Sequence, residues 1–378
     1  MKRILILNWR DPKSPLEGGA ERFTKKYAEY WAEQGNKVYW LTNSFKGSKN
    51  KETINKVEYI RVSPSLNGRL ISYIFKYPIF LIKSIIEAKK IIKKQNIDII
   101  IDEIHGLPFF SPLFSKKRNI LLTCEVAGPI WDKMFPFPIN VFGKLSEKLI
   151  YRLYENTEIW AISNNTKKNI QELIPQKAVS LIGLGIDQNV ELLNKLSNSK
   201  KTKYPSAVFL ARLVKMKGIE TALLATAKII ITLPNFQLFV VGDSSSSYKL
   251  YLKDLVAKLG IVNNVKFMGK VSELDKYKYL KQAHFLIHPS FKEGFGLTII
   301  EAGLVGTPSI VRKGSSMDRL IKNNKNGYVF SFDSEIVDLY IKGYQKQTYA
   351  NLAQNAVLNA KKYFWENILE KSIEITEI

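Results

Sequence analysis

Apolar residues follow two patterns along this chain: short uninterrupted runs, and stretches with helical spacing. In the first half, an apolar run at Lys2–Asn8 precedes a helical stretch at Ala20–Glu33, which Gly35 ends, and a second run follows at Lys37–Thr42. Short apolar runs are typical of strands in a parallel sheet, which is covered on both faces. Three more such runs follow, at Ile97–Asp102, Asn119–Thr123 and Thr157–Ile162. The pattern predicts a Rossmann-like domain.

The second half of the chain repeats this alternation. A strand is predicted at Ala207–Ala211, a helix at Ile219–Ile231, and further strands at Gln237–Val241 and Val265–Phe267. Between the halves, Asn194–Pro205 is rich in Lys, Ser and Asn, and we interpret it as the region between two domains. The predicted fold class is therefore α/β. In open sheets of this class, ligands bind beyond the carboxyl ends of the strands.

Length and composition agree with a folded protein of two domains, since the 378 residues are 46% hydrophobic and 12% aromatic. The single cysteine, Cys124, excludes an intrachain disulfide and a multi-cysteine metal site. The N-terminal apolar run is too short for a signal-peptide core, and no uninterrupted apolar segment is long enough to span a membrane. We expect a cytoplasmic protein, or one peripheral on the inner face of the cell membrane.

The charge balance adds a question about partners, because 57 basic and 34 acidic residues give a net charge of +23. Nucleic acid, an anionic membrane surface and phosphorylated substrates are the polyanions to consider. Nucleic acid is the least favoured, since neither a zinc-finger spacing nor an RNA-binding aromatic signature is present. A lysine-rich composition of the thermophilic type explains most of the charge equally well.

The stretch with the clearest chemistry is EGFGLTIIEAGLVGTPSIV, in which Glu293 and Glu301 bracket a glycine-rich turn between a strand and a helix. The first N–H groups of a helix are unpaired and its dipole is positive there, so we predict that a phosphate binds at Gly296, Leu297 and Thr298. One turn further, Glu301 can accept two ribose hydroxyls, while Glu293 points toward the group on the distal phosphate. Taken alone, the turn also fits an ordinary crossover with two solvated glutamates.

This stretch resembles the E-x7-E signature of retaining glycosyltransferases of family 4, the glycosyl transferases group 1. Further segments match in order along nearly the whole chain: Gly18–Glu21, Ala161–Ile170, Leu184–Asp187, Ala211–Gly218, Val240–Asp243 and Phe267–Val271. The resemblance implies the GT-B fold, two Rossmann-like domains facing a cleft. We expect residues 1–190 to form the N-terminal acceptor domain and 191–362 the C-terminal nucleotide-sugar-binding domain. Residues 363–378 are expected to form a C-terminal helix that packs back on the N-terminal domain, with Tyr363, Phe364 and Trp365 as anchors.

The family implies transfer of a hexose from a nucleotide-diphosphate sugar with retention and without a metal or other cofactor. Negative charge then grows on the departing diphosphate, and Arg212 and Lys217 are the best candidates to neutralise it. We expect Glu293 to bind the sugar and Glu301 the ribose. The predicted donor-binding set is Gly18, Gly19, Gly242, Gly296, Leu297, Thr298 and Glu301. The chain lacks the Asp-x-Asp ligand pair of metal-dependent transferases.

One departure from the family concerns a histidine that many members place after the strand ending here in LLTCEVAG. This chain has Cys124 and Glu125 there. The change leaves open an altered sugar choice, a different acceptor geometry or a loss of activity. His105, in a neighbouring loop, is a candidate replacement, and a loop histidine that caps a turn explains it equally well. For Cys124, packing is favoured over a nucleophilic role, because no histidine is near in sequence.

The acceptor side is less defined. The predicted helix Ile79–Lys94 has one apolar face and one lysine-rich face, and Trp131–Phe142 is an apolar loop with aromatic residues. Both segments are candidates for contact with an anionic membrane surface and a lipid-linked or glycan acceptor. For Ile79–Lys94 alone, a helix packed on its own sheet is the favoured interpretation. The acceptor-side candidates are His105, Cys124, Glu125 and Trp131.

Two other functions remain open. A nucleotide-sugar epimerase of similar fold needs acid and base groups on the sugar, and three histidines without clear partners argue against it. A non-catalytic sugar-nucleotide-binding or membrane-scaffold protein would keep the binding residues and lack turnover.

Overall fold

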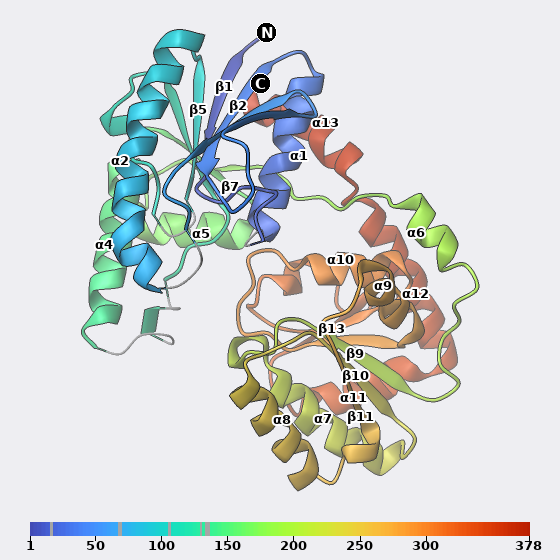
Figure 1. Cartoon of the computed structure of the whole chain (residues 1–378). Helices are drawn as coiled ribbons and strands as arrows, with labels where there is room; N and C mark the ends of the chain where they lie inside the picture. Colours follow the sequence, from blue (N-terminus) through green and yellow to red (C-terminus); the bar gives the residue numbers. More distant parts are fainter. Residues whose placement is uncertain (16–17, 67–69, 105–106, 129–130, 133–136) are drawn as a thin grey trace. The chain divides into compact units, whose positions relative to one another are not determined.

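The computed structural model describes the whole chain except residues 16–17, 67–69, 105–106, 129–130 and 133–136. The chain forms two compact units, residues 1–184 with 369–378 (unit 1) and residues 185–368 (unit 2). Each unit is one sheet covered by helices (Figure 1). The polar stretch Asn194–Pro205, predicted to separate the domains, lies inside unit 2 instead. Exposed loops within a domain have the same composition as linkers, so composition alone did not distinguish them.

Unit 1 contains an eight-stranded sheet in the order β3-β4-β2-β1-β5-β6-β7-β8. Every neighbouring pair is parallel except β3 with β4. The strands are β1 (Arg3–Leu7), β2 (Lys37–Asn43), β3 (Lys51–Ile54), β4 (Val57–Val62), β5 (Ile99–Ile104), β6 (Arg118–Thr123), β7 (Glu158–Ala161) and β8 (Ser180–Leu181). The sequence did not predict β3 and β4, because charged residues interrupt both of these segments at the sheet edge.

The helices of unit 1 cover both faces of this sheet. They are α1 (Gly19–Glu33), α2 (Leu70–Gln95), α4 (Ile139–Leu153), α5 (Asn164–Leu173) and the end of α13 (Trp365–Thr376), with a short 3-10 turn η1 (Ser111–Leu113). Helices α2, α4 and α5 pack on the face that carries Leu5, Ile100 and Leu121. The α2 helix begins nine residues before the predicted Ile79, since it continues through Pro78.

Unit 2 contains a six-stranded parallel sheet in the order β11-β10-β9-β12-β13-β14. Its strands are β9 (Ser206–Leu210), β10 (Gln237–Val241), β11 (Val265–Gly269), β12 (Phe285–His288), β13 (Ser309–Arg312) and β14 (Gly327–Phe330). After β9, the chain adds β10 and then β11 along one edge of β9. It then returns, and β12 pairs with the other edge of β9. The order therefore reverses between β9 and β12, which is where such sheets bind ligands.

The helices of unit 2 enclose two apolar clusters, one on each side of its sheet. They are α6 (Val190–Lys195), α7 (Ile219–Thr232), α8 (Ser246–Lys258), α9 (Glu273–Gln282), α10 (Leu297–Leu304), α11 (Glu335–Tyr344) and α12 (Lys346–Lys361), with the 3-10 turns η2 (Lys215–Lys217), η3 (Val262–Asn264) and η4 (Met317–Leu320). The other strands and helices predicted in both halves are confirmed to within two residues at each end.

The C-terminal helix α13 begins in unit 2 and ends in unit 1. Tyr363 and Phe364, which precede it, pack in a core cluster of unit 2. Near its end, the backbone carbonyl of Thr376 accepts a hydrogen bond of 3.2 Å from the Arg118 guanidinium of β6.

The hydrogen bonds of a buried carboxylate in unit 1 should contribute to the stability of the fold. Asp102 of β5 accepts hydrogen bonds from the backbone N–H groups of Phe109 and Ser111, both at 2.9 Å, and from the Tyr154 hydroxyl. Removing that hydroxyl in Tyr154→Phe should lower the free energy of unfolding by about 1–2 kcal/mol, measured by urea denaturation. In the control Tyr59→Phe, the lost hydroxyl is buried without a partner among the described residues. An equal loss in both variants would contradict the role of Asp102.

Candidate functional site

The site in unit 2 lies where the loops after β9 and β12 meet. The Lys217 ammonium, in η2 after β9, donates to Oε1 of Glu293, after β12, at 2.7 Å. Nε2 of His288, the last residue of β12, lies 3.0 Å from the same oxygen. The structure thus brings together two predicted residues and adds His288, which sequence reasoning missed. Its signal was its place at the end of an apolar run, five residues before Glu293.

The electrostatics of this cluster fix the charge of Glu293. Burial by itself would raise the pKa of this carboxyl, but the hydrogen bond and charge of His288, together with the Lys217 ammonium, lower it to about 2. The imidazole of His288 is buried and stacks on the Phe209 ring, with ring centres 6.0 Å apart. Glu293 is therefore an ionised carboxylate in a fixed position at neutral pH.

Arg212 has a different environment. It follows β9 by two residues, as predicted, and its side chain is exposed. Within the described part of the chain it forms no ion pair and takes no part in the Lys217–Glu293–His288 cluster. Its guanidinium is thus an uncommitted positive charge beyond the carboxyl end of β9.

The turn before α10 has an uncapped helix start, and the binding of a phosphate there stays a prediction. Gly296 precedes the helix with a φ of +99°, in the left-handed region, and a Cβ there would lie 2.6 Å from the Met317 side chain. Among the described residues, no side chain caps this helix end. The N–H groups of Leu297 and Thr298 belong to the first turn, where helical backbone has no internal partner.

Glu301, one turn into α10, faces a cation from another helix. The ammonium of Lys276 in α9 donates to Oε1 of Glu301 at 2.8 Å and to Oε1 of Glu273 at 2.6 Å. Lys276 and Glu301 are both mostly buried, whereas Glu273 is exposed. In the described part of the chain, the other oxygen of Glu301 accepts no hydrogen bond. Sequence reasoning missed Lys276, because 25 residues separate it from its partner.

The backbone at Gly242 requires a glycine for a structural reason that its motif did not reveal. Its φ is +137°, and a Cβ would lie 1.8 Å from the carbonyl oxygen of Ala211. Its N–H donates to the Gly269 carbonyl at 2.9 Å. Gly242 thus lets the ends of β9, β10 and β11 approach closely, and its contact with a donor stays a prediction.

In unit 1, the glycine pair lies at the start of α1. The N–H of Gly18 donates to Oε2 of Glu21 at 2.6 Å, so this donor already has a partner within the chain. A Cβ at Gly19 would meet nothing within 4 Å. Of the pair, Gly19 is the residue whose surroundings leave space for a ligand.

The strands β1, β5 and β6 of unit 1 end in a buried polar cluster. Oε2 of Glu103 accepts from the Asn8 amide and the Thr24 hydroxyl, both at 2.7 Å, and the Cys124 sulfur lies 3.8 Å from Oε1. Burial raises the pKa of Glu103 to about 8. Burial, followed by the charge of Glu103, also raises the pKa of the Cys124 thiol. Cys124 therefore stays a protonated thiol, which agrees with packing rather than nucleophilic attack.

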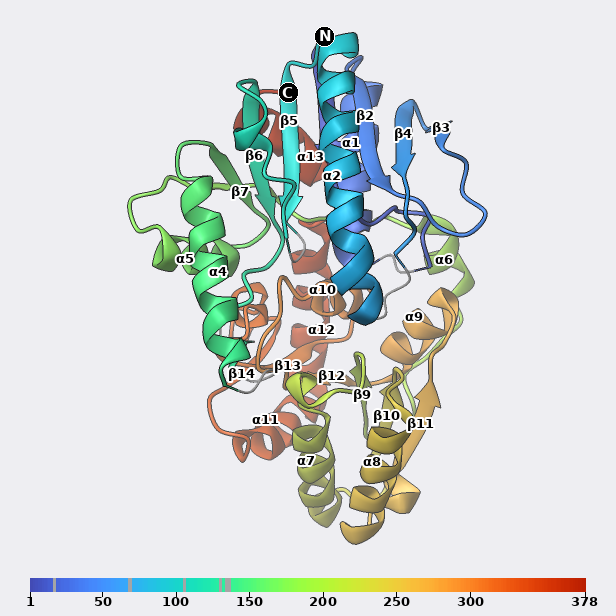
Figure 2. The ribbon, with the colours of Figure 1, turned by 60° about the vertical axis from the view of Figure 1, so that its left-hand side comes forward.

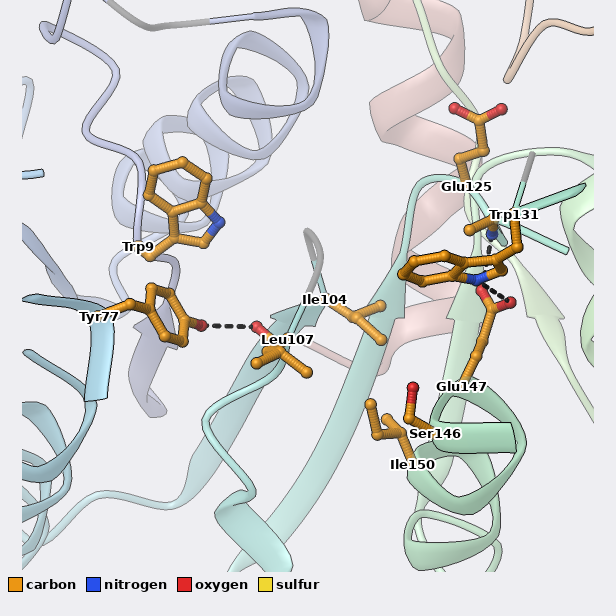
Figure 3. A pocket seen from close by; sticks show the side chains of 10 residues that line it. Trp9, Tyr77, Ile104, Leu107, Glu125, Trp131, Ser146, Glu147 and Ile150 are labelled. Atoms are coloured by element: carbon orange, nitrogen blue, oxygen red, sulfur yellow. Dashed lines mark hydrogen bonds between the residues drawn. The ribbon is translucent and has the colours of Figure 1, made fainter. Parts of the chain in front are cut away.

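A pocket of about 410 Å³ opens in unit 1, within the size range of small-molecule sites. Its lining includes the predicted acceptor-side residues Glu125 and Trp131, but not Cys124; His105 lies outside the described residues. Figure 3 shows Trp9 and Tyr77 on one side, and Trp131 with the residues of α4 on the other. Among the described residues, the lining consists of Trp9, Tyr77, Ile104, Leu107, Glu125, Ala127, Trp131, Ser146, Glu147 and Ile150.

Glu147 of α4 shapes one wall of this pocket. Its carboxylate accepts from the N–H groups of Ala127 and Gly128, at 2.6 and 2.8 Å, and from the Trp131 indole at 3.3 Å. Figure 3 shows the indole held above this carboxylate. The sequence did not reveal that Glu147 positions Trp131, because the link depends on a turn of the loop.

Comparison with known proteins finds a matching protein family for each half of the chain. The model "Glycosyltransferase Family 4" matches residues 17–190, and "Glycosyl transferases group 1" matches residues 193–363. An uncharacterized glycosyltransferase of Methanocaldococcus jannaschii is 26% identical over 100% of this chain and 98% of its own length. The sucrose-phosphate synthase of Thermosynechococcus elongatus has a TM-score of 0.80 at 16% identity, over 100% of this chain and 98% of that one. HepE from Anabaena, solved with UDP-glucose, has a TM-score of 0.71 at 16% identity, over 100% and 99%.

The pKa of Glu293 predicts a pH-dependent contribution to stability. Because it lies below the ordinary value of 4.5, the ionised carboxylate stabilises the folded state; this contribution is complete above about pH 5 and is lost as the pH falls through about 2. The difference in unfolding free energy between the wild type and Glu293→Gln should therefore be about 2 kcal/mol smaller near pH 3 than near pH 7.

Urea denaturation across this pH range measures the difference. Glu273→Gln is the matched control, since Glu273 is an exposed carboxylate that also pairs with a lysine. A difference for Glu293→Gln that does not change with pH would contradict the assigned environment.

Proposed function

Because the chain belongs to the GT-B glycosyltransferases that join a family 4 domain to a group 1 domain, we propose that it is a retaining hexosyltransferase. It would move a hexose from a nucleotide-diphosphate sugar to an acceptor. The observation that carries this proposal is the Lys217–Glu293–His288 cluster beside the uncapped start of α10, at the strand reversal of unit 2. A negative group that binds sugar hydroxyls and a positive environment for phosphates lie there in one loop system.

Each part of the donor would have its own partner. The Leu297 and Thr298 N–H groups, with Arg212 and Lys217, would bind the diphosphate and neutralise the charge that grows on it as the glycosidic bond breaks. Glu301 would hold the ribose through its free oxygen, and Glu293 the sugar hydroxyls. Two side-chain cations and a helix end supply the positive charge, so we propose a reaction without a metal or other cofactor.

The choice of a first donor rests on a structural neighbour. HepE was solved with UDP-glucose, which supports testing UDP-hexoses before GDP- and ADP-sugars. For the acceptor we propose a glycan or lipid-linked precursor of a cell-envelope polysaccharide, bound in the pocket of unit 1. The apolar lining and the carboxylates of Glu125 and Glu147 support a ligand with apolar and hydroxyl groups.

We also propose that the protein works at the inner face of the cell membrane as a peripheral protein. The net charge of +23 supports attraction to anionic lipid. Among the helices that the structure describes, none combines the length and apolarity needed to cross a bilayer.

Donor turnover tests the proposed function. The protein is incubated with UDP-, GDP- and ADP-hexoses, with and without membrane extract, and released nucleotide and transferred sugar are measured. Transfer with retained configuration supports the proposal. Binding without turnover, even with acceptors, would instead support a non-catalytic sugar-nucleotide-binding or scaffold protein, and reversible isomerisation of the donor would support an epimerase.

The two carboxylates of the donor site should affect different constants. Glu301→Ala removes a charged hydrogen bond to the ribose and should raise the KM for the donor about 10- to 100-fold with little change in kcat. Glu293→Ala should mainly lower kcat, by about 100-fold, because its charge acts at the reacting centre. Equal losses of affinity with unchanged turnover in both variants would refute this division.

Lys276 should act through Glu301. If the ammonium positions the carboxylate for ribose, Lys276→Met raises the KM for the donor by roughly tenfold at unchanged kcat, and Lys276→Arg restores most of the affinity. Lys278→Met, an exposed lysine on the same helix, serves as the control. A lower KM in Lys276→Met would show that the lysine competes with the ribose instead.

A further inference from the structure

His288 is a buried histidine at the carboxyl end of β12, beside the proposed donor site. Its side chain is 2% exposed, and its ring stacks on Phe209 of β9 with an angle of 11° between the two ring planes. Figure 2 shows β12 beside β9 in the sheet of unit 2. Because both rings belong to neighbouring strands inside the sheet, packing holds the imidazole in one place.

Among the described residues, Glu293 is the one hydrogen-bond partner of this imidazole. Nε2 lies 3.0 Å from Oε1 of Glu293, whereas Nδ1 is buried without a partner. An ionised carboxylate only accepts hydrogen bonds, so Nε2 carries the proton and donates it. A proton on Nδ1 would be a buried donor without an acceptor in the described part of the chain. The surroundings of the ring therefore fit the Nε2–H tautomer.

Two donors at Glu293 bind the same carboxylate oxygen. The Lys217 ammonium donates to Oε1 at 2.7 Å, and this is also the oxygen that His288 binds. Within the described part of the chain, Oε2 accepts no hydrogen bond, and the side chain of Glu293 is 16% exposed. The second oxygen is thus available to the hydroxyl groups of a ligand.

Lys217 and His288 differ in what else they can bind. Lys217 is one of the cations proposed to bind the diphosphate, and its ammonium lies on a flexible stem that can turn toward a phosphate. His288 has no such second partner, because its ring is buried and stacked on Phe209. The hydrogen bond of His288 is therefore the contact that still fixes Glu293 when a diphosphate competes for Lys217.

We propose that His288 is a positioning residue, which holds Oε1 of Glu293 so that Oε2 faces the hydroxyl groups of the donor sugar while Lys217 serves the diphosphate. A buried ring cannot itself touch the donor, so His288 acts through Glu293. This inference rests on the proposed function and deepens it, because it assigns recognition of the sugar, and not of the nucleotide, to this hydrogen bond. Loss of the Nε2–H donor should therefore weaken the binding of the sugar part alone.

Nuclear magnetic resonance of the full chain with isotope-labelled histidine tests the tautomer without any substrate. The chain has three histidines, so the variants His105→Gln and His284→Gln identify two of the signals and leave the third to His288. We expect the Nε2–H form, with a proton that exchanges slowly with water and a resonance that moves in Glu293→Ala. An Nδ1–H tautomer, or a signal that Glu293→Ala leaves unchanged, would overturn the inference.

Calorimetric titration with UDP and with UDP-glucose tests the positioning role; the GDP or ADP pair replaces them if the wild type prefers it. His288→Phe keeps a ring against Phe209 and removes the donor, whereas His288→Gln keeps an N–H donor. We expect His288→Phe to bind UDP as the wild type does and UDP-glucose about tenfold more weakly, and His288→Gln to recover most of that loss.

His284→Phe is the matched control. His284 is also buried, but it precedes β12 at the opposite end of the strand and bonds the Ser206 hydroxyl at 3.0 Å, so this variant should bind both ligands as the wild type does. Equal losses for UDP and UDP-glucose in His288→Phe, unchanged affinity for both, or the same sugar-specific loss in His284→Phe would each overturn the inference.

Urea denaturation shows whether the variants fold, and the spectra of the wild type decide the tautomer even if His288→Phe does not. A wild type that binds no nucleotide sugar would contradict the proposed function. The tautomer of His288 and its response to Glu293→Ala would still be measurable in that case, so the two failures can be told apart.

Discussion

The strand order of unit 2 reverses at β9, and the arrangement of its site depends on this reversal. The strands β10 and β12 flank β9 on opposite sides, so the loops beyond β9 and β12 diverge and leave space between them. The ion pair of Lys217 and Glu293 spans that space. Since the backbone of Glu293 also donates to the Ser315 carbonyl at 3.0 Å, the loop after β13 is tied to the same point. Glu293 thus joins the loops after three strands, through its carboxylate and its backbone N–H, just before the turn from which α10 starts.

Partners decide what each buried carboxylate of this chain can do. Glu293 and Glu301 each face a lysine, and the partners of Glu293 hold the pKa of its carboxyl well below the ordinary value. Glu103 has only neutral hydrogen-bond donors, so burial dominates and keeps it protonated near neutral pH. Glu147 binds backbone N–H groups and serves the shape of a loop. Burial alone therefore does not decide the role of a carboxyl in this chain, and its partners do.

Most of the fold follows from patterns within short stretches, which is why the sequence predicts it well. The buried strands are uninterrupted apolar runs, and the turn before α10 needs glycine at Gly296 for a local reason. Features that depend on distant neighbours were not predictable. Lys276 contacts Glu301 only once α9 and α10 pack together. The sequence did not predict β4, because Arg61 interrupts its apolar run; in the fold, Arg61 pairs with the buried Asp11. Local patterns determine elements, and packing determines which charges meet.

The α4 helix shows why a hydrophobic pattern cannot decide function unaided. Its sequence has apolar residues on two sides, and either side alone would account for packing on a sheet. Only the structure shows that the side with Tyr151 and Tyr154 is buried and the side with Leu145 and Leu149 is exposed. For the predicted helix Ile79–Lys94 the expected apolar face does pack on the sheet, and it is a different set of isoleucines that stays exposed. Packing, and not the pattern, therefore decides which apolar side of each helix stays exposed.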